Sequence, residues 1–211
     1  MWLRWIPIVI VALAAPAVAR AQSASAQAQS LFDEARGLLR RGKTAEACTA
    51  FDASQKLDPA VTTLLNLADC REQNHQLATA WGAFIDAGRL ARTTNNAKLA
   101  KVAASHAKKL EPRLSKLTIA VAPARQLAGL EIKRDSEPVI AASWNHALPI
   151  DGGRYTITAT APGRQPWSTT VEVAAERDAK VLDVPALAEA APAVAVPEPA
   201  AARVAEPAPT P

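Results

Sequence analysis

Two cysteines, Cys48 and Cys70, are the side chains of this sequence best placed to react with each other. They are equally spaced about Pro59, so two helices folded back at this proline would bring both thiols to the same height. In an oxidising compartment this spacing predicts a disulfide, worth about 3 kcal/mol on a chain-entropy model. Two buried free thiols are the alternative, and no C-x-x-C motif supports a redox pair.

The other reactive side chains do not form a pattern typical of an enzyme. His75, His106 and His146 lie far apart, and none is four residues from another histidine or a cysteine. The acids at 33–34 and at 135–137 are explained by a helix N-terminus and a β-turn. Because P-loop, G-x-G-x-x-G and G-x-S-x-G motifs are missing from the sequence, we expect no catalytic residues, cofactor or bound metal.

The N-terminal segment is typical of a secretory signal peptide. Arg4 supplies the charged start, Ile6–Ala19 is an apolar run, and small residues follow it. We expect cleavage after Ala21, which leaves Gln22 first, with cleavage after Ala19 as second choice. An uncleaved anchor is the alternative, although the run is shorter than the roughly 20 residues of a membrane span. The mature protein is therefore expected in the periplasm or outside the cell, with no transmembrane span.

The composition limits both the core and the partners. The chain has 211 residues, room for one or two domains, and only 4% aromatic residues, so any core is small and closely packed. Removing Arg4 and Arg20 with the signal peptide leaves 24 − 2 = 22 basic against 20 acidic residues. This near balance argues against nucleic acid as a partner.

Helical patterns fill the chain to about residue 114. Ser30 and Asp33 are spaced as a capping pair and predict that the first helix begins there. Gly42 is placed to end that helix, because glycine readily adopts the left-handed conformation. Further breaks are expected at residues 58–59, 74–75, 93–96 and 111–112. The pattern therefore predicts five helices, which form two pairs and a single terminal helix.

The helical part repeats itself. Residues 45–57 lie over residues 78–90 at an offset of 84 − 51 = 33. The pairs brought together are Ala47 with Ala80, Ala50 with Ala83, Phe51 with Phe84, and Leu57 with Leu90. A two-helix unit of this length cannot bury its apolar face alone and must stack on a neighbour. Such stacks usually bind other proteins.

The two units resemble tetratricopeptide repeats, which implies a helical-repeat domain. The first unit matches at Leu31, Ala35, Leu38, Gly42, Ala47, Phe51, Ser54 and Pro59, and the second at Leu64, Leu67, Ala68, Ala80, Phe84 and Ala87. The second departs from the family at Arg71, His75 and Arg92. The resemblance implies that the first helix of each unit lines a partner groove. The groove residues that it implies are Phe32, Arg36, Leu39, Arg40, Leu65, Asp69, Glu72 and Gln73. Arg36 or Arg40 could instead pair with Asp69 or Glu72.

After Leu114 the apolar residues alternate as in β-strands. Strands are expected at 117–121, 130–134, 139–142, 147–150, 155–159, 170–173 and 179–184, separated by turn signals. Short strands at this spacing favour a small antiparallel β-sandwich. The opening strand, the strand after Gly153 and the segment Ala161–Gly163 resemble a PEGA domain. That resemblance implies a bacterial envelope protein and no catalytic residues.

Two surface features allow other partners. Residues 89–116 hold eight basic side chains against one acid: Arg89, Arg92, Lys98, Lys101, Lys108, Lys109, Arg113 and Lys116. A solvated helix face is the simpler interpretation, and a patch for an anionic envelope polymer or lipid headgroup is the alternative. Trp144, Tyr155 and Trp167 are either sheet-packing residues or platforms for sugar rings.

The sequence therefore predicts a multidomain chain of α and β parts. The expected segments are a signal peptide (1–21), a tetratricopeptide-like helical domain (22–114), a PEGA-like antiparallel β-sandwich (115–187) and a disordered Ala/Pro-rich tail (188–211). Within the helical domain the repeats are 28–59 and 61–92, and the capping helix is 97–111. The predicted function is non-enzymatic protein–protein interaction or scaffolding in the bacterial cell envelope. Glycan or peptidoglycan binding through the β-domain aromatics is the alternative, and the partner is unknown.

Overall fold

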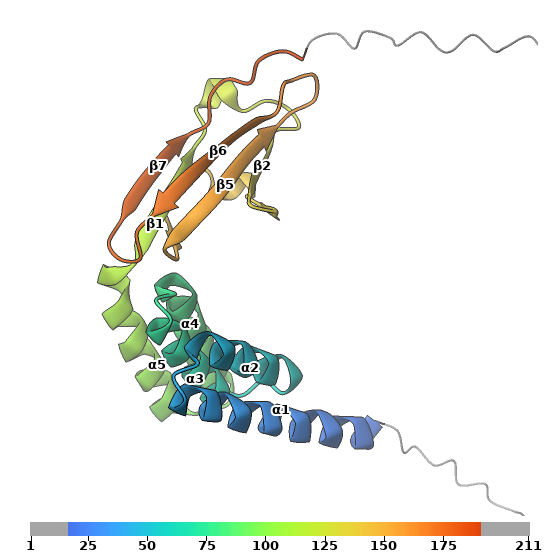
Figure 1. Cartoon of the computed structure of the whole chain (residues 1–211), viewed down its shortest axis with the longest axis vertical. Helices are drawn as coiled ribbons and strands as arrows, with labels where there is room; N and C mark the ends of the chain where they lie inside the picture. The colour runs from blue at the N-terminus through green and yellow to red at the C-terminus, as the bar shows by residue number, and fades with distance from the viewer. Residues whose placement is uncertain (1–16, 191–211) are drawn as a thin grey trace, which may run out of the picture.

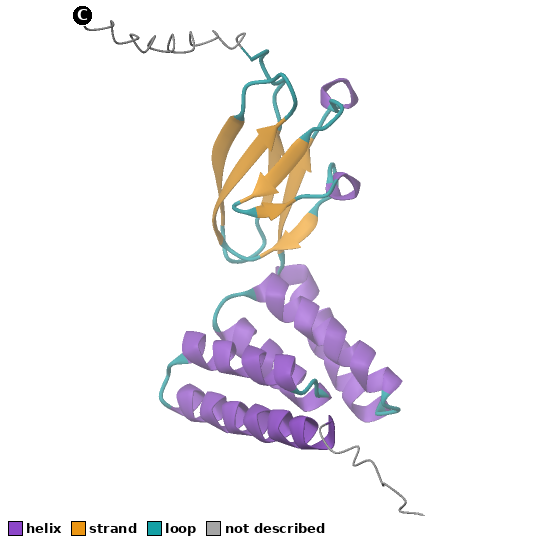
Figure 2. Ribbon diagram, turned by 90° about the vertical axis from the view of Figure 1, so that its right-hand side faces the viewer, coloured by secondary structure: helices purple, strands orange, loops and turns teal. Residues whose placement is uncertain are grey.

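The structure, a computed structural model, describes residues 17–190 of the chain, with side chains from residue 24 onward. Within this range five helices are followed by seven short strands (Figure 1). The predicted signal peptide lies outside the residues whose side chains are described, and most of the predicted tail, 191–211, lies outside the described residues altogether. The helices gather at one end of the molecule and the strands at the other (Figure 2).

The helices fold back on one another in chain order. They are α1 (Ala17–Arg40), α2 (Thr44–Leu57), α3 (Val61–Gln73), α4 (Leu77–Thr93) and α5 (Ala97–Leu110). Each packs against the next along the chain, so α1–α2 and α3–α4 are hairpins and α5 packs on α4. No helix in the described range combines the length and apolar character needed to cross a bilayer.

The first helix begins earlier than the sequence pattern predicts. The prediction that Ser30 caps its start is wrong, because α1 already begins at Ala17 and Ser30 lies inside it. The segment before Ser30 is rich in alanine and has no glycine or proline after Pro16. Alanine has the highest helix propensity, so nothing in this segment interrupts the helix.

Residues that the internal repeat superimposes are buried alike. Phe51 of α2 and Phe84 of α4 are 0% and 1% exposed, and Ala47 and Ala80 are both completely buried. The same offset joins Ala35 of α1 to Ala68 of α3, which are also completely buried. The repeat in the sequence therefore corresponds to equivalent packing positions in the two hairpins.

Three helices end in the same hydrogen-bonded turn. Gly42, His75 and Asn95 have φ of 72°, 58° and 55°, and each follows the end of a helix. At Gly42, the N–H of Gly42 reaches the carbonyl of Leu39 and the N–H of Lys43 reaches that of Leu38. This pair of bonds is a Schellman motif, and corresponding bonds occur at His75 and Asn95. The glycine predicted to end the first helix is therefore confirmed.

The strands form two sheets. They are β1 (Ser115–Ala120), β2 (Glu131–Arg134), β3 (Glu137–Pro138), β4 (Leu148–Ile150), β5 (Gly153–Thr160), β6 (Trp167–Val173) and β7 (Ala179–Asp183). One sheet has the order β4-β1-β7 and the other β3-β2-β5-β6. The expectation of purely antiparallel pairing is wrong at one place, because β1 and β7 run parallel with Leu117 opposite Lys180.

Both sheets contribute to one apolar core. Ile119 and Ile150 come from the first sheet, while Ile132, Ile157 and Val173 come from the second, and all are at most 6% exposed. This shared core explains why the apolar residues alternate along each strand.

Two expectations for the β part need correction. The strand predicted at 139–142 is absent, because the backbone there bends into a short 3-10 helix, Ala141–Ser143, after β3. Residues 188–190, which were predicted to begin the tail, are held against the strand part, because Glu189 forms a β-bridge with Arg164 and the N–H of Ala190 donates to the carbonyl of Gly163.

The two parts of the molecule meet through specific side chains. A single 3-10 turn, Glu111–Arg113, joins α5 to β1, and Leu114 after it is buried in the helical core. Arg113 donates hydrogen bonds to Glu72 of α3 and, at 2.7 and 3.1 Å, to Glu176 of the β6–β7 loop. The linker residue therefore joins the helical part to the strands.

Candidate interaction site

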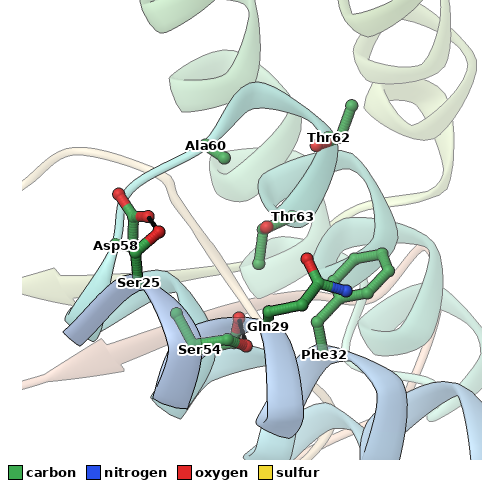
Figure 3. A pocket seen from close by; sticks show the side chains of 9 residues that line it. Ser25, Gln29, Phe32, Ser54, Asp58, Ala60, Thr62 and Thr63 are labelled. Carbon is green, nitrogen blue, oxygen red and sulfur yellow. Dashed lines mark hydrogen bonds between the residues drawn. The ribbon is translucent and has the colours of Figure 1, made fainter. Parts of the chain in front are cut away.

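A polar pocket lies where α1 passes over the turn between α2 and α3. It has a volume of about 150 Å³ and is shown in Figure 3. Its lining residues are Ser25, Ala28, Gln29 and Phe32 of α1, Ser54 and Asp58 at the end of α2, and Ala60, Thr62 and Thr63 at the start of α3. Three chain segments are therefore needed to form it.

Two hydrogen bonds fix the walls of this pocket. The Ser25 hydroxyl donates to the Asp58 carboxylate at 2.6 Å. The hydroxyl of Ser54, which is buried, donates to the backbone carbonyl of Ala28 at 2.8 Å. Because both bonds join α1 to the end of α2, they hold the middle of α1 against α2.

The α1 residues of the pocket continue into the predicted groove residues. Ser25, Gln29, Phe32, Arg36 and Arg40 follow one another at intervals of three or four, so they lie along one side of α1. The corresponding stripe on α3 starts at Thr62 and includes Leu65, Asp69, Glu72 and Gln73. The pocket therefore lies at the N-terminal ends of the two stripes.

In the first hairpin the predicted groove residues divide into core and surface. Phe32 and Leu39 are partly buried against the first helical core, and the Phe32 ring meets the Phe51 ring edge-on at 5.3 Å. Arg36 and Arg40 are exposed. Only the two arginines are therefore presented fully to solvent.

In the second hairpin the acidic groove residues already have partners. Asp69 lies 3.6 Å from His106 of α5, and partial burial raises the pKa of its carboxyl, opposed by the nearby histidine. Glu72 pairs with Arg113. The suggestion that Arg36 or Arg40 pairs with these acids is therefore wrong, because His106 of α5 lies beside Asp69 and Arg113 of the linker pairs with Glu72. Leu65 packs on the second helical core, and Gln73 is exposed.

The predicted disulfide is confirmed. Cys48 of α2 and Cys70 of α3 are bonded, with 5.5 Å between their Cα atoms. Both residues are completely buried, and the bond crosses from the first hairpin to the second. The two hairpins that form the pocket and both stripes are thereby joined covalently.

The basic run does not form one uniform surface. Arg89 pairs with Asp86, and Arg113 is held between Glu72 and Glu176. The lysines of α5 are exposed: Lys98, Lys101, Lys108 and Lys109. The remaining exposed positive side chains of the run are therefore these lysines together with Arg92 of α4 and Lys116 of β1.

The aromatic residues of the β part pack on its core. Trp144, Tyr155 and Trp167 are all partly buried against the shared core. The Trp144 indole N–H donates to the carbonyl of Val139 at 3.1 Å. Burial raises the pKa of the Tyr155 hydroxyl, with a further increase from Asp151. A cavity of about 310 Å³ adjoins Trp144 and is also lined by Glu131 and Lys133.

Residues considered for catalysis are placed in structural roles. The Asp135 carboxylate accepts the backbone N–H of Thr156 at 2.9 Å, and Asp33 accepts the side-chain amide of Gln29 at 3.0 Å. His106 stacks beside Phe84 with 4.8 Å between ring centroids. Among residues 24–190, no three His, Cys, Asp or Glu side chains are grouped as metal ligands.

Several site residues were not identified from the sequence. Ser25, Asp58 and Thr63 lie on three different segments, and the Asp58-Pro59 pair was interpreted only as a helix stop. The regular spacing of 25, 29, 32, 36 and 40 is the one signal that could have found the α1 side of the pocket. Comparison of the chain with protein-family models and with curated proteins found no match.

Proposed function

We propose that this chain is a non-enzymatic interaction protein of the bacterial cell envelope and binds a partner protein along the α1 and α3 stripes. Under this proposal the helical hairpins are tetratricopeptide-like repeats, at 28–59 and 61–92, with residues 97–111 as the capping helix. Residues 115–187 are a PEGA-like β-sandwich. The partner remains to be identified.

The observation that carries the proposal is the continuity between a pocket and an exposed polar stripe. The pocket of about 150 Å³ leads along α1 to Arg36 and Arg40, which are exposed, and the α3 stripe ends in the exposed Gln73. A groove that combines a cavity with unburied charge suits an extended peptide or a helix. The disulfide supports the proposal further, because it holds the two hairpins in one arrangement before binding.

The test is a charge reversal on the full-length chain. The Arg36→Glu/Arg40→Glu double variant should capture less of its partner from envelope extract than the parent protein, while its helical circular dichroism stays unchanged. Lys101→Glu/Lys108→Glu on α5 is the matched control, because it changes charge by the same amount on another helix. Loss of capture only in the control would contradict the groove and favour an anionic polymer on α5.

The proposed location has its own test. If the signal peptide is cleaved after Ala21, mass spectrometry of the exported protein should find Gln22 as its first residue. Cleavage after Ala19 should instead leave Arg20 first. Recovery of intact Met1 in a membrane fraction would contradict a cleaved signal peptide.

A second candidate function is glycan binding at the β part. It is favoured by the cavity of about 310 Å³ beside Trp144. This cavity is twice as large as the helical pocket, and its wall carries one acidic and one basic side chain, Glu131 and Lys133. Titration with soluble peptidoglycan fragments should then shift the Trp144 indole N–H signal in NMR spectra. An unchanged signal at saturating fragment would exclude this candidate.

A further inference from the structure

The pocket between α1, α2 and α3 has negative charge without a balancing cation. Asp58 is the one charged residue in its lining, and no lysine, arginine or histidine is among the lining residues. Within the described residues, the Asp58 carboxylate accepts one side-chain hydrogen bond, which the Ser25 hydroxyl donates to a single oxygen, Oδ2. Because a carboxylate can accept several hydrogen bonds, acceptor capacity is left at the pocket wall.

A second polar group lines the pocket. Thr63 is 6% exposed as a residue, and the side-chain hydrogen bonds found among the described residues do not involve its hydroxyl. Because no sealed side-chain oxygen in the described residues lacks a partner, this hydroxyl is accessible from the cavity and can bond a ligand or water there. Figure 3 shows the Gln29 amide oxygen turned toward Thr63, while the amide nitrogen of Gln29 is used by Asp33.

The acceptors and the ring together define a chemical class of occupant. Carboxylate, amide and hydroxyl oxygens of Asp58, Gln29 and Thr63 surround the pocket, and the Phe32 ring forms another wall. We propose that this pocket receives the side chain of a lysine from the partner. A lysine ammonium has three donors and no acceptor, and an aromatic face attracts a cation.

Size and geometry favour lysine over arginine. A cavity of about 150 Å³ can hold a group as large as benzene, and the butylammonium part of lysine is no larger. The guanidinium of arginine is a planar fork with five donors that fits two parallel oxygens. The Ser25 hydroxyl already donates to Oδ2 of Asp58, so a guanidinium fork would have to share that oxygen, whereas a single ammonium donor can use Oδ1.

The surroundings of the pocket add a constraint on the partner. Arg36 and Arg40 lie one and two helical turns from Phe32 on the same side of α1, and both are exposed. A segment that lies along α1 with its lysine in the pocket would place its neighbouring residues near these arginines. The segment is therefore expected to carry acidic residues on the side of the lysine that faces these arginines. This inference rests on the proposed function, because it names the partner chemistry of the same surface.

The test uses a small probe, so it does not require the partner. n-Butylammonium chloride should produce saturable NMR shifts at Thr63 and at the Gln29 side-chain amide, whereas n-butanol should not. n-Butylguanidinium should bind more weakly. Tighter binding of the guanidinium probe, or no saturable shift with n-butylammonium, would overturn the lysine assignment.

Matched variants decide whether the proposed acceptors hold the probe. Asp58→Asn keeps the size of the side chain and removes its charge, and it should weaken n-butylammonium binding about tenfold or more. Thr63→Val replaces the hydroxyl by a methyl and should weaken binding several-fold. Asp86→Asn, an exposed acid of α4, is the control and should leave binding unchanged. Equal binding by the parent, Asp58→Asn and Thr63→Val proteins would contradict the inference.

The probe and the partner separate the inference from the proposed function. If n-butylammonium does not bind but the Arg36→Glu/Arg40→Glu change still abolishes partner capture, the inference alone is wrong. If n-butylammonium binds at Thr63 and the double change leaves partner capture intact, the pocket is a cation site and the groove proposal is wrong.

Discussion

The carboxylate of Asp151 accepts the backbone N–H of Thr79 at 3.1 Å, although 72 residues separate the two positions. The same carboxylate accepts the N–H of Ala78 at 2.7 Å and the Thr79 hydroxyl. Ala78 and Thr79 lie in the first turn of α4, so a residue of the strand part caps a helix of the other part. The N-cap residue itself, Gln76, makes no cap bond, because its side-chain oxygen accepts from Arg71 and Asn74.

Replacing Asp151 should therefore destabilise the whole chain. Asp151→Ala should lower the free energy of unfolding by about 1 kcal/mol, since the first N–H groups of α4 lose their acceptor. Asp151→Asn keeps an oxygen acceptor and should cost less. Urea denaturation checks both, with the exposed Asp183→Ala as control. Equal stability of the Asp151→Ala and parent proteins would show that water replaces the cap without cost.

Replacing His75 by glycine should stabilise the protein. His75 holds a left-handed conformation, with φ of 58°, at the position that glycine occupies in the first hairpin. The left-handed conformation costs a non-glycine residue about 1–2 kcal/mol, and glycine loses part of that gain to extra freedom in the unfolded chain. We expect His75→Gly to raise the free energy of unfolding by about 0.5–1 kcal/mol.

Asn95→Gly is the control for this effect. Asn95 also has positive φ, but asparagine is the residue other than glycine that most often takes this position after a helix. Its replacement should change stability little. A larger gain at Asn95 than at His75 would contradict the explanation by backbone conformation.

Removing the disulfide should weaken the helical part. The bond joins residues 22 apart and is completely buried. A Cys48→Ala/Cys70→Ala protein should lose about 3 kcal/mol of stability on the chain-entropy model. Chemical denaturation of the helical circular dichroism signal measures this loss. A reduced protein as stable as the oxidised one would indicate that packing alone holds the hairpins together.

The contact between the two parts should weaken in acid. Hydrogen bonds from Arg113 hold the pKa of Glu176 below its usual value of 4.5. The same bonds raise the pKa of the Arg113 guanidinium, the bond to Glu176 contributing most. Because the pKa of Glu176 is lowered by folding, its contribution is complete above pH 4.5 and is lost as pH falls through the folded value.

This pH dependence can be assigned with one variant. Glu176→Gln should make stability fall less steeply below pH 4.5 than in the parent protein. Glu172→Gln, an exposed change on β6, should keep the parent slope. Part of the slope should persist in both, because the backbone N–H of Ala174 holds the pKa of Asp178 low as well. Identical slopes for the Glu176→Gln and parent proteins would show that the contact does not depend on this charge.

Local patterns in the sequence predicted the elements better than their contacts. The offset of 33 residues placed Phe51 and Phe84 in equivalent positions, and the spacing about Pro59 predicted the disulfide. Alternation located most strands, but it could not show that β1 pairs with β7 in parallel, because that pairing joins segments far apart in sequence. The early start of α1 was missed because Ser30 was taken as a cap within a segment that was already favourable for a helix.

In the candidate site, too, features within one helix could be predicted from the sequence, whereas contacts between distant segments could not. The resemblance to tetratricopeptide repeats implied Phe32, Arg36 and Arg40 as groove residues, and their helical spacing agrees with a position on one side of α1. The pocket depends on Asp58 meeting Ser25, 33 residues earlier, and the cap of α4 depends on Asp151. Such contacts arise from the packing of distant segments, so periodicity and motif spacing carry no information about them.

The central claim is that the α1 and α3 stripes contact the partner, and photo-crosslinking in the producing cells tests it most directly. A photoreactive residue would replace Arg36, Arg40 or Gln73 on the stripes, and Glu46, Asp86 or Glu172 elsewhere. We expect the three stripe positions to give one common adduct and the other positions to give none. Adducts formed from Glu172 on β6 but from no stripe position would contradict the claim and place recognition in the β part.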